Sequence, residues 1–246
     1  GRLIMVAALG NRAPVRRAEG EAISPGTSRA FANFTPRPRW ANRMRFACSA
    51  DCDYLFTPEI RKVWFYDASA STYTDYTDEA TDKSGATHVT LSDMTSSDYL
   101  YIGFDEVVAG LVVNVDGTNS TGSRTMAVYY LHLATWTDSS VTDGTASGGA
   151  TLAQDGLCTF SLPSAWTEGT VNGIEKLFWL RVSVSGTIDS SVTLDQIQGI
   201  YRNTNYARVE ASGGEAREIL FDTSRIGGLE LLAPGGSPNV DIEWLG

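Results

Sequence analysis

The sequence contains only two histidines, the side chain that most often acts as general base beside a serine or cysteine nucleophile. His132 shares one face of an expected strand with Met126, which indicates a core or half-buried position, and His88 lies next to Val89 in a short strand pattern. The sequence has no Gly-x-Ser-x-Gly elbow, no phosphate-binding P-loop and no His-Glu-x-x-His helix. We therefore expect no enzymatic activity.

Paired carboxylates are harder to recognise, because the two acids of a glycosidase are close in space and have no fixed spacing in sequence. Asp105, Glu106, Glu168 and Glu175 are possible members of such a pair, although a solvated surface position is the simpler interpretation of each. The acidic loops 75–82 and 138–143 hold oxygen ligands for calcium but do not match the EF-hand pattern. We expect no catalytic residue, no cofactor and no metal site, and leave calcium binding open.

Aromatic side chains near strand ends could bind carbohydrate, since sugars stack on ring faces while polar neighbours bind their hydroxyls. Trp136 and Trp179 are our candidate glycan-binding residues, and Tyr73, Tyr76 and Trp166 are further candidates. Ordinary packing at strand ends is the simpler interpretation of these rings. A carbohydrate-binding module is therefore our alternative hypothesis.

The elements that must position these residues are short strands, separated by clusters of Gly, Asp, Ser and Thr. This pattern predicts an all-β fold, a β-sandwich of jelly-roll type over residues 57–202. In 177–185, a period of two predicts that Leu180 and Val182 face the core and that Trp179 and Arg181 face solvent. Strands are expected at 61–66, 87–91, 98–104, 110–115, 124–133, 157–161, 177–185 and 192–201.

Both ends of the chain differ from this body. Residues 1–56 contain four prolines and no sustained periodicity, which predicts an extended N-terminal arm with little core of its own. Strand patterns at 217–222, 228–232 and 239–244 predict a C-terminal β extension over 203–246. This extension either closes the sandwich or forms a small sheet against a neighbouring subunit.

Charge divides the chain in the same way. Residues 1–50 hold nine arginines, no lysine and two acids, which gives them a net charge of +7. Because the whole chain carries −10, the remaining residues carry −17. Such an arm is either a solvated tail or a segment that becomes ordered along an acidic partner surface. The negative charge of the remaining residues opposes binding to nucleic acid. The residues expected to bind that partner are Arg12, Arg16, Arg17, Arg29, Arg37, Arg39, Trp40, Arg43 and Arg45.

Three cysteines are too few for a disulfide scaffold, and their odd number fits assembly in a reducing cytoplasm. Cys48 and Cys52 offer two ligands where a structural zinc site needs four. No apolar run reaches the roughly 18 residues of a membrane-spanning helix. We expect no association with a membrane.

An ordered series of motifs runs through 98–200, from Asp98-Tyr-Leu-Tyr-Ile-Gly-Phe104, through Thr125-Met-Ala-Val-Tyr-Tyr130 and the hairpin signal Asn172-Gly173, to Phe178-Trp-Leu-Arg-Val182. This series resembles a β-sandwich unit of virion structural proteins of tailed bacteriophages. The resemblance implies a capsid-decorating, cement or head–tail-associated protein. Its partners would be the major capsid protein or other virion subunits, it would form a homo-oligomer, and it would reside in the virion after assembly in the host cytoplasm.

Overall fold

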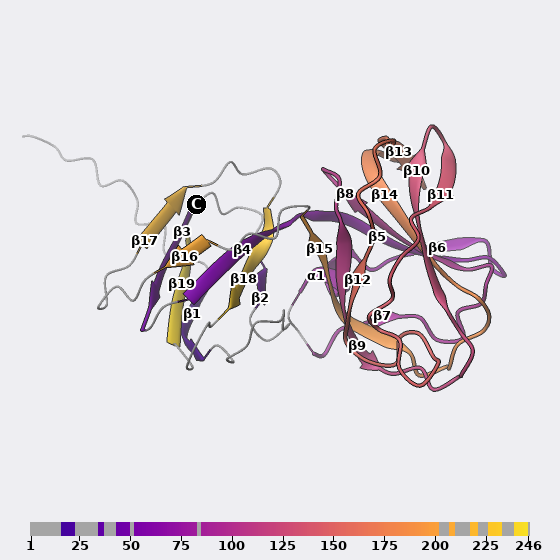
Figure 1. The fold of residues 1–246 in the computed structure, drawn as a ribbon, viewed down its shortest axis with the longest axis horizontal. Coiled ribbons are helices and arrows are strands. Elements are labelled where there is room, and N and C mark those ends of the chain that lie inside the picture. The colour runs from indigo at the N-terminus through magenta and orange to yellow at the C-terminus, as the bar shows by residue number, and fades with distance from the viewer. Residues whose placement is uncertain are drawn as a thin grey trace, which may run out of the picture.

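The structure is a computed structural model that describes residues 16–22, 34–36, 43–49, 52–82, 85–201, 207–209, 217–220, 226–232 and 239–245. These residues form nineteen strands and one short helix, α1 (Thr77–Thr81), so the predicted all-β class is confirmed. The strands gather into two bodies, a sandwich built from β5 to β15 and a second body built from the strands near both chain ends (Figure 1). Within the described ranges, no helix is long and apolar enough to cross a membrane.

The sandwich consists of two antiparallel sheets. The larger sheet has seven strands and contains, in order, β11 (Thr135–Asp138), β10 (Met126–His132), β14 (Ile174–Val184), β8 (Tyr99–Phe104), β5 (Ile60–Asp67) and β6 (Thr72–Asp75), with β13 (Gly169–Val171) paired to β14 off this path. The smaller sheet contains β12 (Gly156–Thr159), β9 (Gly110–Gly117), β15 (Thr193–Ile200) and β7 (Val89–Thr90).

The sandwich core lies between these two sheets and comes from alternate positions of their strands. On the larger sheet, Val63, Ile102 and Leu180 are completely buried, and Leu111 and Leu194 of the smaller sheet are buried almost as fully. Period-two alternation therefore places the other half of each strand of the larger sheet on its outer face.

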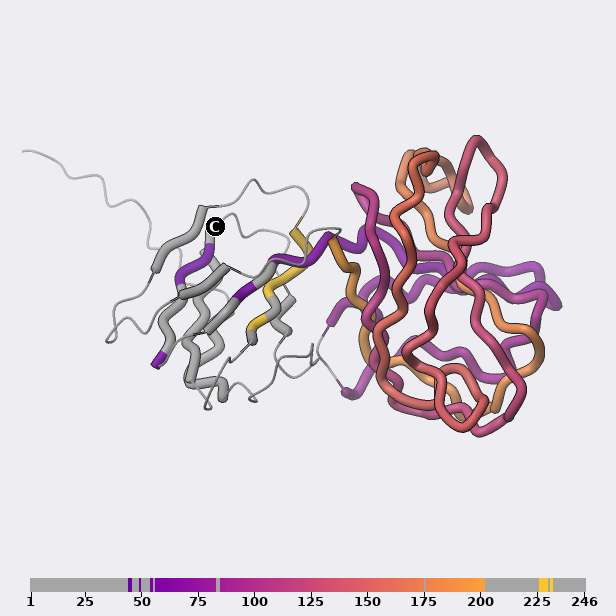
Figure 2. Tube along the Cα trace, viewed as in Figure 1, coloured from indigo at the N-terminus to yellow at the C-terminus, as the bar shows by residue number. Residues whose placement is uncertain are grey.

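The second body, which we call the terminal unit, is built from strands at both ends of the chain. One of its sheets has the order β1 (Arg16–Ala22), β19 (Asn239–Leu245), β3 (Arg43–Cys48) and β17 (Arg217–Leu220). The other has the order β16 (Ala207–Val209), β4 (Cys52–Pro58), β18 (Ile226–Leu232) and β2 (Phe34–Pro36). In both sheets, N-terminal and C-terminal strands alternate. Figure 2 accordingly shows indigo and yellow segments in the same body.

This alternation brings basic and acidic positions opposite each other within the chain. In the first sheet the register pairs Arg17 with Glu243, Glu243 with Arg45, and Arg45 with Glu218. The four positions share one face of the sheet, and Met44, whose side chain is completely buried, belongs to the other face. Part of the positive charge of residues 1–50 is therefore matched by the chain's own C-terminal strands.

All eleven strands predicted from the sequence occur, with ends shifted by a few residues. Sequence patterns did not predict β6, α1, β11 or β13, which lie between the predicted strands of the sandwich. Residues 1–56 contribute strands that pair with the predicted C-terminal extension. The proline pattern excludes a helix but not an edge strand: Pro36 lies in β2, which is at the edge of its sheet.

We predict that Glu243→Lys lowers the free energy of unfolding of the terminal unit by about 1–2 kcal/mol, because it replaces two opposite-charge cross-strand pairs with two like-charge pairs. Amide hydrogen exchange of β3 and β19 measures this loss. Arg17→Glu in the same chain should restore part of it. Asp241→Lys is the matched control, since Asp241 lies opposite Ala47, and an equal loss in this control would contradict the charge pairing.

Candidate functional site

The outer face of the seven-stranded sheet carries a layer of aromatic rings. These side chains alternate along their strands with the residues of the sandwich core. We call this set the aromatic face, and it consists of Trp64, Tyr66, Tyr73, Tyr99, Tyr101, Tyr129, Trp136 and Trp179.

Arg181 lies in the middle of the aromatic face. In the register it is opposite Tyr101 on one side and Tyr129 on the other. Its guanidinium carbon is 4.6 Å from the ring centroids of both Tyr99 and Tyr129 and 5.0 Å from that of Trp136. Cation–π attraction between the guanidinium and these three rings stabilises the aromatic layer. The charge of Arg181 is thereby engaged with aromatic partners.

Trp179 is completely buried, so the sequence prediction that this position faces solvent and stacks on a sugar is wrong. Its indole Nε1 donates a hydrogen bond of 2.9 Å to the carbonyl oxygen of Gly169. Gly103 on the neighbouring strand β8 makes room for the indole, because a Cβ atom there would lie 2.9 Å from the ring. Trp179 is therefore a packing residue that fixes β13 over the sheet.

A hollow of about 370 Å³ opens on the aromatic face next to β13. Tyr101 forms its floor with an exposure of only 7%, and Tyr73, which is 36% exposed, stands at one side. The ring centroid of Tyr101 lies 6.1 Å from that of Tyr73 and 5.5 Å from that of Trp136. The hollow, which we call the aromatic pocket, is lined by Tyr73, Tyr101, Leu131, Ala134, Trp136, Glu168, Gly169, Thr170, Val171 and Asn172.

The second wall of the aromatic pocket is polar. Glu168, Thr170 and Asn172 line it, and all three side chains are exposed. Within the described part of the chain, none of these side chains makes a hydrogen bond or ion pair, so their donors and acceptors are free for a ligand. The wall belongs to the hairpin of β13 and β14, whose turn residues Asn172 and Gly173 both have positive φ, as the sequence predicted.

Burial sets the protonation of the phenols in the pocket. It raises the pKa of Tyr101 to about 12, although the nearby Arg181 acts in the opposite direction. The pKa of Tyr73 is also raised, first by burial and then by the neighbouring Tyr66. Both phenols therefore stay neutral at physiological pH and can donate hydrogen bonds.

The other aromatic candidates lie outside the pocket. Trp166 is buried in the sandwich core, where its ring centroid lies 6.0 Å from that of Phe178, and Tyr76 packs against the same core. Trp136 and Tyr73 are thus the two ring candidates that the structure brings together. Sequence reasoning did not identify Tyr101 or Asn172 as pocket residues, because only strand pairing places them beside Trp136.

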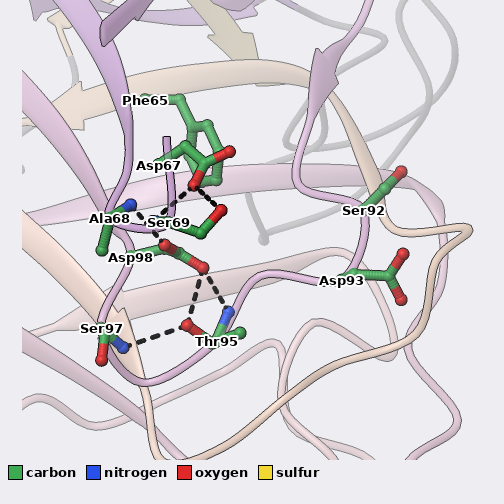
Figure 3. A pocket seen from close by; sticks show the side chains of 9 residues that line it. All are labelled: Phe65, Asp67, Ala68, Ser69, Ser92, Asp93, Thr95, Ser97 and Asp98. Atoms are coloured by element: carbon green, nitrogen blue, oxygen red, sulfur yellow. Dashed lines mark hydrogen bonds between the residues drawn. The ribbon is translucent and has the colours of Figure 1, made fainter. Parts of the chain in front are cut away.

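A second hollow, of about 490 Å³, contains three carboxylates, Asp67, Asp93 and Asp98 (Figure 3). Asp98 is buried and accepts hydrogen bonds from the Ala68 amide at 2.8 Å and the Thr95 amide at 2.7 Å. Hydrogen bonds from Ser69 and Ala70 hold the pKa of Asp67 below its usual value. Asp67 and Asp98 therefore stabilise loop turns. Among the described residues, no group of three or more His, Cys, Asp or Glu side chains is arranged to bind a metal ion.

The histidine and carboxylates considered for catalysis do not form a catalytic arrangement among the described residues. The Nδ1 atom of His132 is hydrogen-bonded to the Ala165 carbonyl oxygen, as fits a structural role. Glu106 accepts a 2.8 Å hydrogen bond from the Tyr201 hydroxyl, and Asp105 lies 3.5 Å from the Arg61 guanidinium. Nothing is described of the Glu175 side chain.

His88 lies between two carboxylates. Its Nδ1 atom is 3.8 Å from Asp116 and 3.9 Å from Asp195. Burial raises the pKa of Asp195, and the nearby acids Asp116, Asp82 and Asp155 add to this effect while His88 opposes it. An ionised Asp195 therefore lowers the stability of the fold, and this loss sets in as the pH rises through its folded-state pKa.

We predict that Asp195→Asn stabilises the sandwich at about pH 7.5, by less than about 1 kcal/mol because the side chain is partly exposed. The gain should disappear near about pH 3, where the wild-type carboxyl is neutral as well. Thermal unfolding across this range measures it. Asp189→Asn should do the opposite, because hydrogen bonds from Ser120 and Thr121 lower the pKa of Asp189 to about 2. A destabilising Asp195→Asn would contradict the assignment.

The predicted partner-binding residues fall into two groups. Arg12, Arg29, Arg37, Arg39 and Trp40 lie outside the described residues. Arg16 and Arg17 belong to β1, and Arg43 and Arg45 belong to β3, so their backbones are engaged in the terminal unit. Among these four, the burial of Arg45 is described, and it is exposed.

Comparison with known proteins adds no relative: no family model matches the chain, and a search of curated proteins finds no significant match.

Proposed function

We propose that the protein is a non-enzymatic carbohydrate-binding module and that its ligand occupies the aromatic pocket. The observation that carries this proposal is a pocket lined both by aromatic rings and by exposed polar residues whose side chains have no partner among the described residues. A pyranose has the same two-sided character, with C–H groups that stack on rings and hydroxyls that exchange hydrogen bonds.

The composition of the pocket supports binding without catalysis. A glycosidase needs two carboxylates about 5–9.5 Å apart across the scissile bond. Among the described residues that line the pocket, Glu168 is the one carboxylate. Other possible acids lie elsewhere, and Asp105 and Glu106 are engaged with Arg61 and Tyr201.

We predict that Trp136→Ala weakens oligosaccharide binding about five- to thirtyfold, since loss of a stacked ring costs about 1–2 kcal/mol. Tyr73→Ala, at a more exposed ring, should give a smaller loss in the same direction. A glycan array followed by titration calorimetry measures both. Leu157→Ala is the control, because Leu157 is 42% exposed on β12 of the other sheet. The proposal fails if binding by the tryptophan variant equals that of wild type while its circular dichroism is unchanged.

A second candidate function is the structural role that the resemblance over 98–200 implies. We propose that the terminal unit attaches the chain to the major capsid protein or other virion subunits of a tailed phage, as a decorating, cement or head–tail-associated protein, and that the chain forms a homo-oligomer. The observation that favours it is that strands from near both ends of the chain form sheets of their own, separate from the two sheets of the sandwich.

We predict that a fragment of residues 57–202 stays folded, because its described strands form the two sheets and the core of the sandwich. The fragment should bind the same oligosaccharide as the full chain but should not join particles when co-produced with phage capsid and tail proteins. Co-sedimentation with particles measures this difference. Incorporation of the fragment at the level of the full chain would remove the terminal unit from the mechanism.

A further inference from the structure

We infer that the aromatic pocket selects neutral saccharides over acidic ones, with Glu168 as the residue that discriminates. This inference rests on the proposed carbohydrate binding and names the class of ligand that the same pocket takes. It is carried by the charges around the pocket.

Glu168 is the one charged side chain among the described residues that line the pocket, and it is exposed and unpaired. A carboxylate accepts hydrogen bonds from sugar hydroxyls, and such charge-assisted bonds are stronger than those between neutral groups. The same carboxylate repels a carboxylate or sulfate of an acidic sugar at short range. Glu168 thus favours a ligand rich in hydroxyls and disfavours an anionic one.

The nearby cations do not line the pocket. Lys176 is exposed in β14, across the hairpin from β13, but is not one of the lining residues. Arg181 is stacked on Tyr99, Tyr129 and Trp136 and does not line the pocket. Lys62 forms an ion pair with Asp75, and its Nζ atom lies 4.5 Å from the Trp64 ring centroid. Among the described residues, no lysine or arginine contributes to either wall of the pocket.

The remaining polar groups suit a neutral ligand as well. Thr170 and Asn172 offer a hydroxyl and an amide, each able both to donate and to accept. The phenol of Tyr73 remains protonated and can donate to a ring oxygen or hydroxyl. These groups recognise alternating donors and acceptors, which is the pattern of vicinal hydroxyls.

The test compares a matched pair of probes on the full chain, a neutral hexose oligosaccharide identified on the array and its C6-oxidised uronic acid counterpart. We expect wild type to bind the neutral probe at least about tenfold more tightly at low salt. Glu168→Gln keeps the size of the side chain and removes its charge. It should weaken neutral binding about three- to tenfold and strengthen binding of the uronic acid, so that the preference shrinks.

Glu79→Gln is the control, because it makes the same chemical change in α1, outside the pocket. Equal or tighter binding of the uronic acid by wild type, or an unchanged preference in Glu168→Gln, would overturn the inference and leave carbohydrate binding intact. Absence of binding to every probe, or binding that Trp136→Ala does not alter, would instead overturn the proposed function. The two failures are therefore distinguishable.

Discussion

The aromatic face depends on one constraint, the burial of β14 on both of its sides. Leu180 and Val182 point into the sandwich core, while Trp179 is buried under the opposite face and Arg181 is enclosed by rings. A slip of one residue would exchange these two sets and bring Arg181 into the core, so the register is strongly specified. The bond from Trp179 to the Gly169 carbonyl then ties the polar wall of the pocket to this fixed strand.

The terminal unit follows a different principle, in which strand pairing depends on both ends of the chain. Each described N-terminal strand pairs only with C-terminal strands, so most of the sequence separates the partners. Such pairings cost more loop-closure entropy than local hairpins such as β10 with β11. The charge opposition between the two ends helps to offset this cost, because Arg17 and Arg45 lie opposite Glu243 in the register.

Period-two patterning predicted eight strands of the sandwich correctly because each has one face in a common core, and it missed β6, β11 and β13, which are only three or four residues long. It failed at Trp179, since Arg181 and Ser183 on the same face indicated solvent, and the neighbouring aromatic strands that cover this face are distant in sequence. Trp136 was identified as a ring candidate, but its pairing with Tyr101 required the strand order. The pairing of N-terminal with C-terminal strands has a trace in the sequence, because charged residues alternate with apolar ones in both β3 and β19. Sequence alone does not say which strands pair.

The junction between the two bodies determines how the aromatic face is presented. Pro58 ends β4 and Ile60 begins β5, so one residue, the buried Glu59, connects them. Gly199 of β15 in the sandwich passes so close to β4 that an added Cβ would lie 2.6 Å from the Pro58 ring. Backbone packed at this density leaves little room for rotation about the connection. If the protein were attached through its terminal unit, its aromatic pocket would point in a defined direction. Several weak sites on one assembly bind with avidity only when their geometry allows them to be engaged together.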